Sequence, residues 1–87
     1  MGTGSRTDVL TSKCLQFKCA ALEEHNELFK EECEAIYSSL VTEERAEMTH
    51  CLLRNLIGLL QRDKGKFKQG QIKRWIWVID FLRQKLC

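Results

Sequence analysis

The feature that most constrains this chain is the stretch from Arg6 to Arg54, which contains neither proline nor glycine. The whole sequence of 87 residues has no proline, and its five glycines lie before residue 5 or after residue 57. Proline and glycine are the residues that most disfavour helices, and the turns of β-rich folds depend on them. We therefore expect an all-α fold. The length is that of one domain, too short for a large enzyme or for two domains.

Apolar residues recur at heptad spacing along the first half of the chain. Two rows of residues spaced by seven hold seven apolar residues out of eight, which is typical of a coiled-coil seam. The seam predicts one long, coiled-coil-like helix over residues 7–40, preceded by a flexible leader over residues 1–6. The residues expected to form an oligomer contact along it are Leu15, Cys19, Leu22, Asn26, Phe29, Cys33 and Ile36.

Asn26 is the one polar residue of this seam, and it supports two interpretations. A single buried asparagine can fix the register and oligomeric state of a coiled coil. Asparagine is also a favourable helix cap, so Asn26 could instead start a new helix after a break near residues 23–26. The sequence does not decide between a continuous and a broken helix.

Two further helices are expected after residue 40. Thr42 can cap a helix over residues 42–63, and Gly65 can end it in the left-handed conformation. The turn before Thr42 is so short that this helix should pack antiparallel to the first as a helical hairpin. A third helix over residues 71–86 would pack back onto the hairpin. The predicted architecture is a small three-helix bundle that forms one domain over residues 7–87.

The last predicted helix is apolar on nearly all sides in its middle turns. Trp75 and Trp77 point about 160° apart on a helix, so one small core cannot bury both. Tryptophan is enriched in protein-binding hot spots because it buries a large area at small entropic cost. The preferred hypothesis is a non-enzymatic protein-interaction module, such as an adaptor, inhibitor or assembly subunit, that also forms a homodimer through the first helix. Its expected partner-binding residues are Trp75, Trp77, Val78 and Phe81.

Charge is strongly segregated along the chain. Residues 23–47 hold nine acidic and two basic residues, a net charge of −7, whereas residues 54–85 hold nine basic and two acidic residues, a net charge of +7. The basic segment would steer the protein toward an acidic partner surface. The alternative hypothesis is a small nucleic-acid-associated protein in which these cations contact phosphates and the interleaved Phe67 and Trp75 stack on bases. The cations in question are Arg62, Lys64, Lys66, Lys68, Lys73 and Arg74.

The five cysteines are odd in number and irregularly spaced, which predicts free thiols in a reducing compartment. The chain begins without an apolar signal region and has no apolar stretch of membrane-spanning length, so we expect an intracellular, cytoplasmic protein that does not bind membranes. Cys33 and Cys51 are equally distant from the turn near Thr42 and would lie at one level of the predicted hairpin. A thiol or metal sensor at that level is the weakest of the functional hypotheses.

Catalytic and cofactor-binding patterns are not found in the sequence. Close cysteine or histidine pairs with the spacing of zinc ligands are absent, as is a glycine-rich phosphate loop. His50 and Cys51 are neighbours in sequence, but adjacent residues point about 100° apart on a helix. We therefore expect no enzymatic activity, no metal and no other cofactor.

Overall fold

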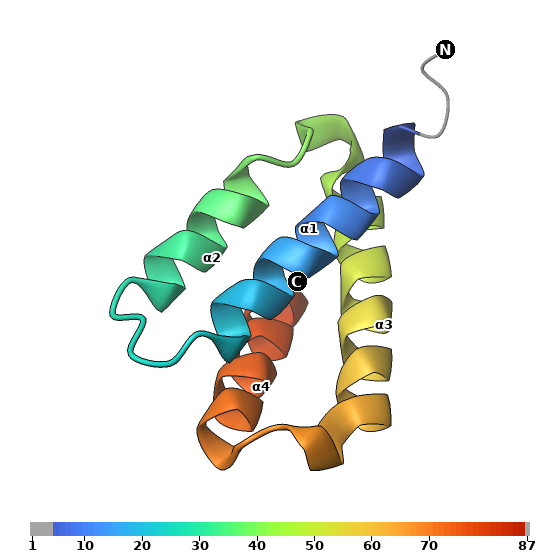
Figure 1. Cartoon of the computed structure of the whole chain (residues 1–87). Helices are drawn as coiled ribbons and strands as arrows, with labels where there is room; N and C mark the ends of the chain where they lie inside the picture. Colours follow the sequence, from blue (N-terminus) through green and yellow to red (C-terminus); the bar gives the residue numbers. More distant parts are fainter. Residues whose placement is uncertain (1–4, 87) are drawn as a thin grey trace.

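The computed structural model describes residues 5–86, with side chains from Asp8 onward, and within this range the chain is helical without strands. The predicted all-α bundle is thus confirmed (Figure 1). The predicted leader lies mostly outside the described residues, and the first helix already begins at Ser5. The α-helices are α1 (Ser5–Leu22), α2 (Phe29–Ser38), α3 (Arg45–Asp63) and α4 (Gln69–Gln84), and the short 3-10 turns are η1 (Thr42–Glu44) and η2 (Lys64–Lys66).

The helix predicted over residues 7–40 is divided into α1 and α2 by a loop over residues 23–28. The division occurs without glycine or proline. His25 adopts a left-handed backbone conformation with φ of 62°, which histidine tolerates better than most residues. The described part of the chain therefore contains four α-helices rather than three, and a continuous coiled-coil seam does not form.

Asn26 stabilises the turn that leads into α2. Its side-chain oxygen accepts a hydrogen bond from the backbone N–H of Leu28 at 3.1 Å, and its amide donates to Glu32 Oε1 at 2.9 Å. Asparagine readily forms such local bonds, which compete with the bonds of a continuing helix. Of the two interpretations of Asn26, the structure supports the break and not the buried coiled-coil asparagine.

The break changes how the helices pack. α1 contacts α2 on one side and α3 on the other, and α4 contacts both α1 and α3 (Figure 1). α2 runs back along α1, and α4 runs back along α3. The short helix α2 is thus paired mainly with α1, whereas the predicted hairpin paired the helix before Thr42 with the helix after it.

The ends of the later helices also differ from expectation. Thr42 begins the 3-10 turn η1, and the cap position of α3 is occupied by Glu44 without a side-chain hydrogen bond. Gly65 lies inside η2 and does not adopt the left-handed conformation that was expected. α4 starts at Gln69, where the backbone N–H of Lys68 donates to Gln71 Oε1 at 2.9 Å.

The core lies where α4 meets the other helices. Trp75 is 1% exposed, and its indole Nε1–H donates to the carbonyl oxygen of Leu56 at 3.0 Å, so the buried polar atom of the ring is satisfied. The other members of the core come from all four helices and, in the case of Leu40, from the turn after α2: Phe17, Ala20, Ala21, Phe29, Cys33, Ile36, Tyr37, Leu40, Met48, Leu52, Leu53, Leu56, Val78, Ile79, Phe81 and Leu82.

Candidate protein-binding surface along α1

The aromatic residues predicted to bind a partner lie largely inside the fold. Val78 and Phe81 are buried with Trp75, and Trp77 is half-buried. The Trp77 ring stacks on Phe81 with centroids 5.3 Å apart, and the ring of Phe29 from α2 meets its edge at 5.2 Å. The expectation of an exposed aromatic face on α4 is corrected because α2, folded back by the loop over residues 23–28, covers this face.

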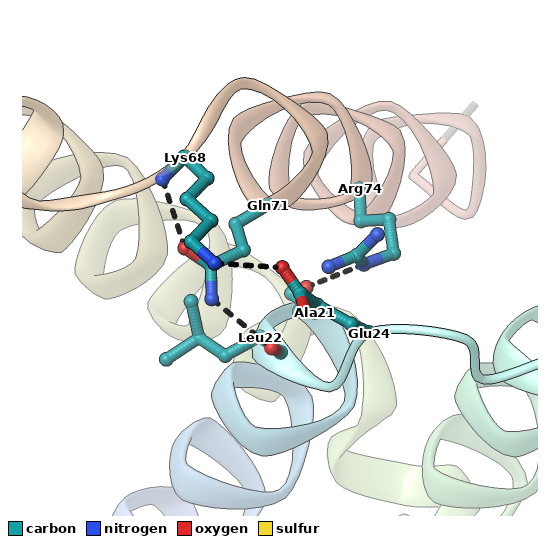
Figure 2. A network of polar contacts seen from close by, with 6 residues as sticks. All are labelled: Ala21, Leu22, Glu24, Lys68, Gln71 and Arg74. Carbon is teal, nitrogen blue, oxygen red and sulfur yellow. Dashed lines mark hydrogen bonds and ion pairs between the residues drawn. The ribbon is translucent and has the colours of Figure 1, made fainter.

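The basic segment is partly used to join α4 to α1. Arg74 Nε donates to the carbonyl oxygen of Ala21 at 2.7 Å, and Gln71 Nε2 donates to that of Leu22 at 3.1 Å (Figure 2). Lys68 Nζ lies 3.3 Å from Glu24 Oε1 in the same network (Figure 2). The bonds from Arg74 and Gln71 satisfy carbonyl groups at the C-terminus of α1 that have no partner within the helix.

The remaining cations of this segment are exposed but lack the predicted aromatic partners. Arg62, Lys64, Lys66 and Lys73 are exposed, and Lys66 Nζ lies 3.6 Å from Asp63. Phe67, however, stacks on the buried Trp75 at 5.3 Å. Since both rings are engaged with each other, the base-stacking surface expected for nucleic acid is not presented.

The predicted oligomer seam is split between two helices with different surroundings. Leu15 and Cys19 on α1 are exposed, whereas the three members on α2 are buried. Leu22 and Asn26 are half-buried. The buried members of the seam are Phe29, Cys33 and Ile36. A straight dimer contact through all seven residues is therefore not available.

Leu15 stands out because 54% of it is exposed on the helix that contacts all the others. A groove of about 560 Å³ lies beside it along the line where α1 meets α2. We call this the α1–α2 groove; its lining residues are Ser12, Lys13, Leu15, Gln16, Cys19, Ala20, Glu23, Glu32, Ala35, Ile36 and Ser39. Its apolar lining consists of Leu15, Ile36 and the small residues Cys19, Ala20 and Ala35.

The two ends of the α1–α2 groove carry opposite charge. At one end, Lys13 Nζ donates to Ser39 Oγ and joins α1 to the end of α2. At the other end lie the carboxylates of Glu23 and Glu32, next to the acidic loop over residues 23–28. A ligand in this groove would meet an apolar floor and a local negative potential at the Glu23 end.

The four cysteines within the described residues are free, so Cys33 and Cys51 form no disulfide. Burial, together with Glu32 and Glu34, raises the pKa of the Cys33 thiol to about 12. Burial also raises the pKa of Cys14 to about 11, and the nearby Cys51 contributes to this increase. Cys51 of α3 is thus near Cys14 of α1, and thiols with such raised pKa values are poor nucleophiles at neutral pH.

Neither a metal-binding cluster nor a membrane-spanning helix is present in the described part of the chain. Within residues 5–86, His, Cys, Asp and Glu side chains do not gather in groups of three or more that could hold a metal ion. In the same range, the helices are too short or too polar to cross a bilayer. His50 is exposed on α3, and His25 is exposed in the loop before α2.

Comparison with known proteins adds no relative. Neither a protein-family model, nor a curated protein, nor a solved structure matches this chain significantly. The function is therefore inferred from the geometry and charge of the protein's own surface.

The sequence pattern missed the residues that make the groove. The predicted binding residues include neither Ala35 nor Ser39, and the heptad pattern places Leu15 in a straight seam. The signal that could have found them is Asn26: a break at that position makes the chain reverse, and the reversal sets residues 12–23 beside residues 32–39.

Proposed function

We propose that the protein is a non-enzymatic interaction module that binds an amphipathic helix of a partner protein in the α1–α2 groove. The observation that supports this proposal is that Leu15 is exposed and lines an apolar groove. It lies on α1, which packs against α2, α3 and α4. Large apolar side chains exposed beside a groove are typical of binding surfaces, and helices commonly bind in such grooves.

The dimensions of the groove fit a short helix. Its α1 wall runs from Ser12 to Glu23, which corresponds to about 16 Å or three helical turns. A ligand helix of that length would place apolar residues, spaced three and four apart, over Leu15 and Ile36. The small side chains of Cys19, Ala20 and Ala35 leave room for it.

The charge of the groove defines the partner further. Glu23 and Glu32 at one end favour a ligand helix that carries lysine or arginine there. The expected partner is thus a basic amphipathic helix. The free thiols of Cys14, Cys19, Cys33 and Cys51 support a reducing, cytoplasmic setting for this interaction.

Fluorescence anisotropy with a labelled helical peptide of leucine, alanine and lysine tests the proposal. Ala35→Gln extends an exposed side chain into the groove and should weaken binding at least about tenfold, which corresponds to about 1.4 kcal/mol. Ala46→Gln is the matched control, because Ala46 is exposed on α3 and lines none of the grooves described here. Failure of the peptide to bind, or equal binding by both variants, would contradict the proposal.

The nucleic-acid alternative has less support, because Lys68 and Arg74 are engaged within the chain and Phe67 is stacked on Trp75. It makes a separate prediction. Labelled duplex and single-stranded RNA would bind with a steep salt dependence that decreases when Lys64 and Lys66 are changed to alanine. That result, without peptide binding, would favour the alternative over the interaction module.

A further inference from the structure

A second groove, of about 370 Å³, lies on the other side of Leu15, where α1 meets α3. We call it the α1–α3 groove. Leu10, Leu15 and Leu59 give it apolar walls, and Gly58 forms part of its surface. It shares only Leu15 with the α1–α2 groove.

Gly58 is unusual because it lies in the interior of α3. Glycine is unfavourable in the middle of a helix, so its presence calls for a local reason. Packing within the fold does not provide one: a Cβ atom at this position would meet nothing within 4 Å. The absent side chain instead leaves the surface of the α1–α3 groove open.

Two arginines define the charge of this groove. Arg54 and Arg62 are exposed on α3 and line the groove, and the lining residues include no aspartate or glutamate. The two arginines are eight residues apart, which is about 12 Å along the helix. Carboxylates spaced by two turns on a ligand helix could each reach one guanidinium group, which binds carboxylates in a well-defined geometry.

From these observations we infer that the α1–α3 groove binds an acidic amphipathic helix of a second partner. An apolar residue of that helix lies over Gly58, and its carboxylates pair with Arg54 and Arg62. This site is independent of the α1–α2 groove and has the opposite charge preference. With both sites, the protein is an adaptor that holds a basic and an acidic helix on opposite sides of Leu15.

The test uses a labelled helical peptide of leucine, alanine and glutamate, with binding measured by anisotropy on the full chain. Gly58→Gln extends a side chain into the groove from a position where a Cβ atom meets nothing within 4 Å, and it should weaken binding of this acidic peptide at least tenfold. Gly65→Gln is the matched control, since a Cβ there also meets nothing within 4 Å and Gly65 lies outside the groove. Thermal unfolding of both variants shows that the fold is retained.

Charge reversal tests the second part of the inference. Arg54→Glu together with Arg62→Glu should abolish binding of the acidic peptide, whereas Lys64→Glu should reduce it less than threefold. The inference is overturned if the acidic peptide does not bind, or if Gly58→Gln binds it as well as the wild type. Concentration-dependent self-association that Gly58→Gln abolishes would also overturn it, because the occupant would then be a second copy of this chain.

The two proposals fail separately. Ala35→Gln should leave binding of the acidic peptide unchanged, and Gly58→Gln should leave binding of the basic peptide unchanged. A loss of both activities in either variant would contradict the independence of the two sites.

Discussion

At the scale of single residues, two arginines replace missing helix caps. Neither α1 nor α2 has a basic residue in its last turn, where a cation would favour the negative end of the helix dipole. Arg74 reaches from α4 to the carbonyl oxygen of Ala21, and Arg45 donates to that of Leu40, just after α2, at 3.1 Å. Each arginine therefore stabilises the end of a helix that precedes it in the chain.

The stability of the protein should depend on Arg74, because this residue binds the C-terminus of α1. Arg74→Ala removes the hydrogen bond to Ala21 and should lower the free energy of unfolding by about 1–3 kcal/mol. Urea denaturation measures this change. Lys73→Ala is the control, because Lys73 is exposed and its loss should change stability by less than about 0.5 kcal/mol. Equal stability of the two variants would show that the arginine is not a cap.

The buried thiols should make stability depend on high pH. The pKa of Cys33 is about 12 in the folded protein, above the ordinary value of 9.0, so the folded state retains a proton that the unfolded state loses. This contribution is complete below pH 9 and is lost as the pH rises toward 12, by at most about 1.4 kcal/mol per pH unit. Urea denaturation of the wild type and of Cys33→Ala between pH 8 and pH 11 compares the slopes. The same slope in both proteins would be the contrary result.

At the scale of secondary-structure elements, the break before α2 determines the fold. The sequence indicated helices in the correct regions, because apolar residues recur at helical spacing within α2, α3 and α4, whereas α1 is only weakly amphipathic. It did not decide between a continuous helix and a chain reversal, since the heptad rows run on both sides of residues 23–28 with Asn26 as their one polar member, and His25 rather than a glycine holds the left-handed position of the loop. The deciding signal was Asn26, whose local hydrogen bonds compete with a continuous helix.

Asn26→Ala tests whether the side-chain hydrogen bonds of Asn26 stabilise the break between α1 and α2. The variant loses the bonds to Leu28 and Glu32 and should be less stable by about 1 kcal/mol, as for other lost caps. Urea denaturation and far-ultraviolet circular dichroism measure both stability and helix content, with Glu27→Ala as an exposed neighbouring control. A gain in helix content and stability would indicate a continuous helix instead.

Gly58 should lower the stability of α3, because it lies in the interior of this helix. Gly58→Ala should raise the free energy of unfolding by about 0.5–1 kcal/mol, because alanine favours the helix and its methyl group has open space. Thermal unfolding would show a higher midpoint temperature. A lower midpoint would mean that the glycine is required for packing, and it would remove the reason for assigning Gly58 to a binding groove.

At the scale of the whole molecule, α2 covers much of the apolar surface of α4 that the predicted three-helix bundle would have left exposed. The radius of gyration is 12.8 Å, close to the roughly 12 Å expected for a compact domain of this length. Trp77 and Phe81 are covered by Phe29 and Tyr37 of α2, so the aromatic residues need no partner to shield them. Several large apolar residues remain exposed, among them Leu28, Val41 and Ile76, and Leu15 of α1 is the exposed one that lines both grooves.

The charge segregation seen in the sequence has two consequences in the molecule. Part of it is neutralised internally, since Lys68 lies near Glu24 and Lys85 Nζ lies 3.7 Å from Glu34. The rest distinguishes the two grooves, with Glu23 and Glu32 on one side of Leu15 and Arg54 and Arg62 on the other. The sequence showed that the charges are segregated along the chain. It did not show that they line different grooves, because this depends on α1 packing between α2 and α3.

Partners are expected to bind along α1 and not at the aromatic face of α4. Backbone amide chemical shifts, recorded by NMR during titration with the basic helical peptide, distinguish these two surfaces. The largest changes should occur at Leu15, Cys19 and Ala35, while the amides of Ile76 and Asp80 change little. Changes concentrated at Trp77 and Phe81, with α1 unaffected, would contradict this expectation.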